Sequence, residues 1–119
     1  MNFDLQPEIE EYRLKVRAFV DEHIIPLESD RANYDHHENI SSDVLIKIQK
    51  KVKEAGLWAP QMPRERGGLG FNQIGMAASY EEMNRSIFGP VCFNCSAPDD
   101  GNMFVLNKVA TEEQKDKWL

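Results

Sequence analysis

The sequence has no long uninterrupted run of apolar residues. No segment approaches the roughly 20 apolar residues that a membrane-spanning helix needs. The first eleven residues, MNFDLQPEIEE, are acidic and lack the basic start and apolar centre of a secretory signal peptide. We therefore expect a cytoplasmic protein, or an organellar matrix protein whose transit peptide has been removed.

Basic residues are scarce relative to acidic ones. Lys and Arg number 14 against 20 Asp and Glu, which gives a formal net charge of −6. Because phosphate binding requires a basic face, this balance argues against nucleic acid as a main partner. Four lysines lie between residues 47 and 53, and we interpret them as a solvated helix face.

Cysteine and histidine are few as well. Cys92 and Cys95 form a C-x-x-C pattern, but no second pair completes the four ligands of a structural zinc site. A thioredoxin-like motif would follow a strand, and none is indicated. The three histidines have no cysteine nucleophile or carboxylate at a useful spacing. The two cysteines are therefore predicted to be small buried apolar residues, and no metal site is expected.

Two further patterns are incomplete. Gly67, Gly68 and Gly70 do not form a dinucleotide fingerprint, because Gln73 occupies the last glycine position. The DDGN run at residues 99–102 lacks the alternating spacing and final glutamate of a calcium loop. From the residues alone, no constellation amounts to an active site.

Helical periodicity is present along most of the chain, and no alternating strand pattern is seen. Apolar residues recur at three- and four-residue steps from about residue 7 to 31 and again from about 42 to 55. Pro26 is expected to end or kink the first helix, and Gly56 to stop the second. The prediction is an all-α bundle of about five or six helices in one domain, residues 1–119.

Capping residues set the expected helix starts. Ser41 or Ser42 suits the second helix and Asn72 the third, which we expect to continue to about residue 86 and to lie centrally, because it is apolar on several sides. Asp99 or Asp100 suits the next. Thr111 opens T-E-E-Q, a capping-box pattern, at the start of the last helix.

Three motifs in order resemble the acyl-CoA dehydrogenase superfamily. The first combines GLW at residues 56–58 with PRERGGLG at residues 63–70, and the second is EEMNR at residues 81–85. The third, ATEEQKDKWL at residues 110–119, departs from the family pattern in having alanine in place of the usual glycine. Within the second motif, Glu81 or Glu82 is expected to pair with Arg85.

The resemblance implies the N-terminal helical domain of a larger enzyme that binds FAD and an acyl-CoA thioester and is a homo-oligomer. A glutamate in a later part of such enzymes removes the α-proton, so this segment supplies no catalytic residue and is expected to be inactive alone, without retained FAD. The resemblance also implies that Phe93, Asn94, Ala97 and Pro98 form a wall of the acyl pocket. Physically, an apolar tail requires a concave apolar wall.

Two other interpretations stay open. One is a self-standing helical module that binds a protein partner through bare apolar faces. The other keeps the enzyme but changes the reaction to that of an acyl-CoA oxidase or a flavin-dependent monooxygenase, because a fold does not fix a function.

Overall fold

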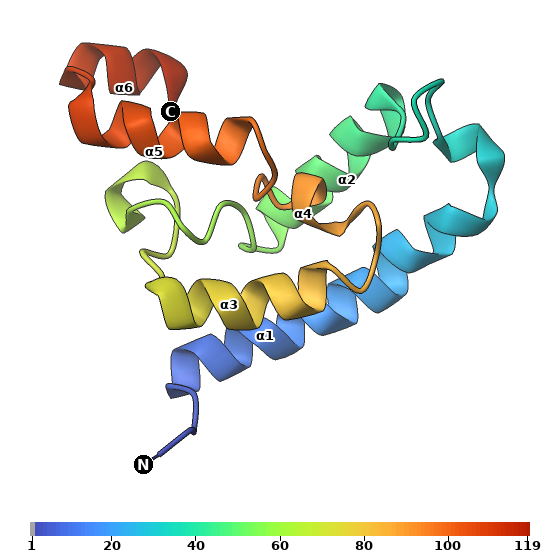
Figure 1. Ribbon diagram of the computed structural model, residues 1–119, viewed down its shortest axis with the longest axis horizontal. Helices are drawn as coiled ribbons and strands as arrows, with labels where there is room; N and C mark the ends of the chain where they lie inside the picture. The colour runs from blue at the N-terminus through green and yellow to red at the C-terminus, as the bar shows by residue number, and fades with distance from the viewer. Residues whose placement is uncertain (1) are drawn as a thin grey trace.

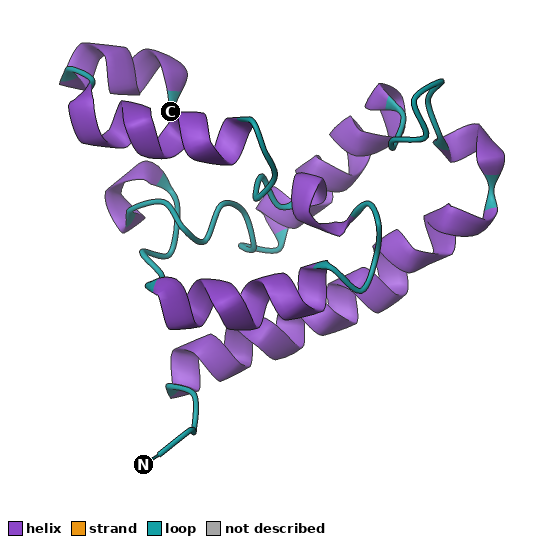
Figure 2. Ribbon diagram, in the orientation of Figure 1, coloured by secondary structure: helices purple, strands orange, loops and turns teal. Residues whose placement is uncertain are grey.

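A computed structural model describes residues 2–119, and it confirms an all-α fold (Figures 1 and 2). Within that range the only β-type pairing is an isolated bridge between Tyr34 and Ile40. The α-helices are α1 (Pro7–Phe19), α2 (Ser42–Glu54), α3 (Gln73–Met83), α4 (Gly89–Cys92), α5 (Asp99–Val109) and α6 (Glu112–Trp118). Across these residues, no helix is long and apolar enough to cross a membrane.

The first helical segment changes its winding where the sequence predicts a break. α1 ends at Phe19, a π-helical turn follows over Val20–Ile24, and a 3-10 turn occupies Ile25–Ser29. Pro26 lies in the first turn of that 3-10 segment. Because proline has no N–H and its ring crowds the preceding turn, the chain continues only with altered hydrogen bonding.

Most predicted helix ends are confirmed. The Asn72 side chain accepts from the Gly75 N–H at 3.0 Å, and Thr111 and Gln114 form the expected reciprocal capping box. Gly56 adopts a left-handed φ of 71° after α2. Ser41 occupies the predicted position immediately before α2, but its hydroxyl makes no capping hydrogen bond.

The capping prediction for α5 is wrong. The residue before the helix is Pro98, and Asp99 and Asp100 both lie inside the first turn. The carboxylate of Asp100 does not cap, because it accepts hydrogen bonds from Tyr80 and Gln61 on neighbouring segments.

The core lies where α1, α2 and α4 face one another, with α3 packed along α1 (Figure 1). The expectation that α3 is surrounded is only half right. Its inner face is buried, but Ile74 on the outer face is 62% exposed. The described chain supplies nothing that covers this outer face. Cys92 and Cys95 are both buried free thiols, as the sequence predicts.

A buried carboxylate joins α3 to α1. The side chain of Glu82 is 4% exposed and accepts from Arg13 of α1. The expected partner, Arg85, lies farther away at 3.8 Å and pairs more closely with Asp21 at 2.6 Å. Because α1 and α3 run side by side, the tertiary neighbour takes precedence over the neighbour along the helix. The EEMNR motif is therefore a structural link in this fold.

Candidate functional site

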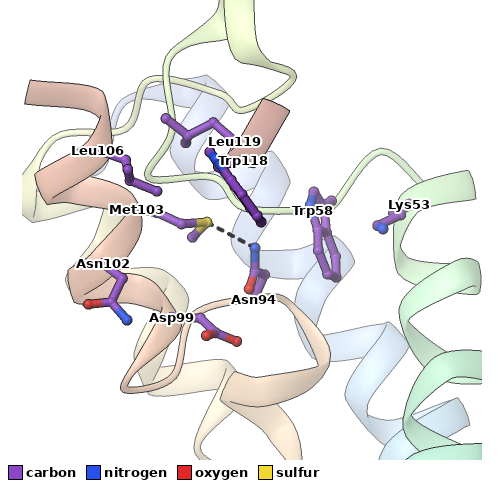
Figure 3. Close-up of a pocket in the computed structure, with 9 residues that line it drawn as sticks. All are labelled: Lys53, Trp58, Asn94, Asp99, Asn102, Met103, Leu106, Trp118 and Leu119. Carbon is purple, nitrogen blue, oxygen red and sulfur yellow. Dashed lines mark hydrogen bonds between the residues drawn. The ribbon is translucent and has the colours of Figure 1, made fainter. Parts of the chain in front are cut away.

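A surface hollow lies beside α5, and we call it the α5 groove (Figure 3). It has a volume of about 610 Å³ and lies between the C-terminal end of α2, the turn after α4, α5 and the end of α6. Its lining combines apolar and polar side chains: Lys53, Trp58, Asn94, Asp99, Asn102, Met103, Leu106, Trp118 and Leu119.

Asn94 occupies the base of the α5 groove in a conformation that two neighbouring side chains hold in place. Its φ is +60°, in the left-handed region that asparagine tolerates better than most residues. Its amide donates to the sulfur of Met103 at 3.1 Å (Figure 3). The Gln61 amide donates to the Asn94 carbonyl at 2.8 Å. Asn94 is thus fixed at both its side chain and its backbone.

Two indoles line the same groove. Trp58 is half-buried, and the Lys53 ammonium lies 4.2 Å from its ring centroid, a cation–π distance. Trp118 projects from α6 toward Asn94 (Figure 3) and is 65% exposed. A groove with two indoles and a thioether on its wall favours an apolar or flat ligand segment.

A mostly neutral hydrogen-bonded cluster lies behind the groove. Asp100 accepts from the Tyr80 hydroxyl at 2.9 Å and from the Gln61 amide at 3.1 Å. The Cys95 thiol donates to the Gln61 carbonyl oxygen at 3.3 Å. Burial, with the nearby Asp100 charge, raises the pKa of Cys95 well above its ordinary range. The thiol therefore stays protonated at neutral pH and is a poor nucleophile.

The four residues that the resemblance assigns to an acyl pocket do not share one surface. Asn94 lines the α5 groove. Phe93 is fully buried, with its ring 5.7 Å from that of Phe19. Ala97 borders a second hollow of about 490 Å³ on the other side of the turn, and Pro98 is exposed and lines neither hollow. In this structure the turn 93–98 separates two grooves.

Several lining residues escape the sequence-based selection. Met103 and Leu106 are one helical turn apart on α5, and that spacing alone could have marked them as one face. Trp58 lies in a motif that the resemblance uses only as a signature. Trp118 lies in the third motif, but only the packing of α6 against α5 brings it to the groove.

The glycine-rich loop does not fit the diphosphate of FAD. A Cβ on Gly68 would lie 2.0 Å from the Met62 carbonyl oxygen, so this glycine permits the loop to close on its own backbone. Arg66 in the same loop pairs with Glu112 and Asp116 of α6. The loop thus braces α6. In residues 2–119 no three His, Cys, Asp or Glu side chains are grouped to hold a metal ion.

Comparison with known proteins assigns the family. The family model for the acyl-CoA dehydrogenase N-terminal domain matches residues 6–119. The chain belongs to the acyl-CoA dehydrogenase N-terminal domain family. The match covers all three motifs.

Individual relatives agree with the assignment. The chain is 37% identical over 116 residues to acyl-CoA dehydrogenase family member 11 of Gallus gallus, covering 92% of this chain and 14% of that protein. It is 28% identical over 124 residues to the probable acyl-CoA dehydrogenase FadE2 of Mycobacterium tuberculosis, covering 100% of this chain and 30% of that protein. A solved structure named as an acyl-CoA dehydrogenase of Mycobacterium abscessus superposes with a TM-score of 0.80 at 34% identity, over 98% of this chain and 31% of that one. The chain thus spans a third or less of each of these relatives.

Proposed function

We propose that this domain forms part of a flavin-dependent acyl-CoA dehydrogenase and supplies one wall of the pocket that holds the acyl chain. Family membership supports the enzyme class. The observation that supports the pocket role is the α5 groove, whose wall of indoles and thioether suits an alkyl chain. The reaction would be the α,β-dehydrogenation of an acyl-CoA thioester in a homo-oligomer.

The chemistry of that reaction is assigned to other parts of the enzyme. FAD, when bound, accepts a hydride from the β-carbon. Within residues 2–119 the buried Glu82 carboxylate accepts from Arg13 through one oxygen and lies 3.8 Å from Arg85 through the other, and the buried thiols are protonated. The domain's own contribution would be to orient the acyl chain and to exclude water from it.

A substitution that fills the groove tests the pocket role. Met103→Trp on α5 should raise the KM of the complete enzyme for long-chain acyl-CoA about tenfold and leave short chains nearly unchanged, because added bulk shortens the available depth. Val105→Trp, on the same helix but 59% exposed, is the matched control. If Met103→Trp and Val105→Trp give the same chain-length profile, the acyl chain does not lie in the α5 groove.

The isolated chain is proposed to be inactive. Purified residues 1–119 should be colourless and should reduce no dye acceptor with acyl-CoA of any chain length. Retention of flavin after gel filtration would contradict the placement of the cofactor outside this domain. In the complete enzyme, comparing a dye acceptor with molecular oxygen distinguishes a dehydrogenase from an oxidase or monooxygenase.

A second candidate function is protein binding. Several large apolar side chains on α5 and α6 are exposed: Phe104, Val105, Val109 and Trp118. A group of exposed apolar side chains indicates that another protein surface packs against it, either from other domains of the same enzyme or from a separate partner. Sedimentation of the isolated chain should show self-association, and a clean monomer at high concentration would count against such a surface.

A further inference from the structure

α5 is attached to the domain by few apolar contacts. None of its residues is buried, although five of its eleven are apolar. The hydrophobic effect therefore fixes its position weakly. The polar contacts at its first turn are correspondingly more important for where the helix lies.

Three side chains make those contacts, and we call them the Asp100 clasp: Gln61, Tyr80 and Asp100. Tyr80 belongs to α3 and Gln61 to the loop after α2, so the clasp joins three separate segments. Both carboxylate oxygens of Asp100 are used, one by each partner. Two directional bonds to different segments fix both the position and the rotation of the helix end.

The clasp also reaches the base of the α5 groove. The Gln61 amide that donates to Asp100 donates as well to the Asn94 carbonyl at 2.8 Å. Asn94 in turn contacts Met103, which lies one helical turn beyond Asp100 on α5. The groove floor and the groove wall are therefore held by the same amide. Gln61 is buried, so water does not readily replace its bonds.

We infer that Asp100 and its two donors are positioning residues that set the width of the α5 groove and hence its selectivity for acyl chains. The inference rests on the proposed function for selectivity, but the positioning itself does not. Loss of either donor would leave the first turn of α5 held by one side-chain bond to Asp100 and by few apolar contacts. The helix would then move relative to Asn94, and the groove would lose its defined width.

Tyr80→Phe is the sharpest variant, because it removes one donor and keeps the ring. Its matched control is Tyr34→Phe, which also removes a 2.9 Å hydroxyl bond, to the Glu28 carbonyl, at a distant connector. Both variants should lower the melting temperature similarly. Only Tyr80→Phe should shift the indole N–H resonances of Trp58 and Trp118 in the NMR spectrum of the 119-residue chain.

The complete enzyme tests selectivity. Tyr80→Phe, and more strongly Asp100→Ala, should lower the ratio of kcat/KM between preferred and disfavoured chain lengths by at least about threefold. The loss should lie in KM, with kcat within about twofold of the parent for the preferred substrate. Tyr34→Phe should leave the ratio unchanged.

The possible outcomes separate the two claims. Indole resonances that move in Tyr80→Phe no more than in Tyr34→Phe overturn the inference, whatever the activity. If the indole resonances shift in Tyr80→Phe but the complete parent enzyme turns over no acyl-CoA, the positioning claim is supported and the proposed function is refuted. Indoles that move while the chain-length ratio of an active enzyme stays constant overturn the selectivity claim. Tyr80→Phe keeps the test valid if Asp100→Ala does not fold.

Discussion

The α1–α3 region and the α5–α6 region of this domain are held in different ways. α1 contributes four buried apolar side chains, and α3 packs along it with the buried Glu82 paired to Arg13. α5 and α6 contribute no buried residue. They are fixed by the Asp100 clasp at one end and by the pairs of Arg66 with Glu112 and Asp116 at the other.

The difference shows that one domain can combine a base held by apolar burial with a wall held by directional polar bonds. Burial stabilises the first region independently of any partner, because the apolar area is already removed from water. The second region exposes its apolar side chains and relies on polar bonds, which contribute less but are directional.

The largest effect should come from the base held by apolar burial. Phe19→Ala on α1 removes a buried ring that contacts Phe93 and should cost about 3–5 kcal/mol of unfolding free energy, measured by urea titration. The counterpart on α5, Phe104→Ala, should cost at most about 1 kcal/mol, because Phe104 is 46% exposed. Equal costs would mean that α5 is as deeply packed as α1.

The ionic link between α1 and α3 should come next. Arg13→Met leaves the buried Glu82 carboxylate without its closest cation, and the expected cost is about 3 kcal/mol. Lys15→Met, which breaks the exposed pair with Glu11, should cost at most about 0.5 kcal/mol. Chemical denaturation of both variants compares them directly, and a small cost for Arg13→Met would show that Arg17 and Arg85 compensate.

Alkaline pH should weaken the core selectively. Burial raises the pKa of the Cys92 thiol from 9.0 to about 12. Because the folded pKa lies above the unfolded one, the stabilisation is complete below pH 9 and is lost as pH rises from about 9 to 12, by up to about 1.4 kcal/mol per pH unit. Cys92→Ala should reduce this pH dependence of the unfolding free energy without abolishing it, because the buried Cys95 thiol, whose pKa is also raised, contributes over the same pH range. An unchanged slope would exclude Cys92 as its source.

The smallest expected effect is at the α6 cap. Thr111→Ala removes the side-chain half of the capping box and should cost about 1 kcal/mol, seen as faster amide hydrogen exchange confined to α6. Ser41→Ala at the start of α2 is the control, since the Ser41 hydroxyl makes no capping bond. Exchange that accelerates throughout the domain would mean that α5–α6 unfolds together with the base.

The local features of the sequence predict much of this fold. Pro26 marks the change in helical winding, Asn72 and Thr111 mark two helix starts, and Gly56 marks the end of α2, because each affects backbone groups only within a few residues of itself. The same local logic fails at Asp100, where partners far along the chain compete for the carboxylate. It is incomplete for Glu82, which forms the expected ion pair with Arg85 at 3.8 Å but a closer one with Arg13 of α1.

The sequence by itself determined the helical class, most helix ends, the burial of both cysteines and the family motifs, since periodicity, backbone geometry and residue order are local properties. Only the tertiary structure decided that Asn94, Met103 and Trp118 share one groove while Phe93 and Ala97 face elsewhere. A turn of six residues can send adjacent side chains to opposite sides, and no local pattern specifies which distant helix will meet each side.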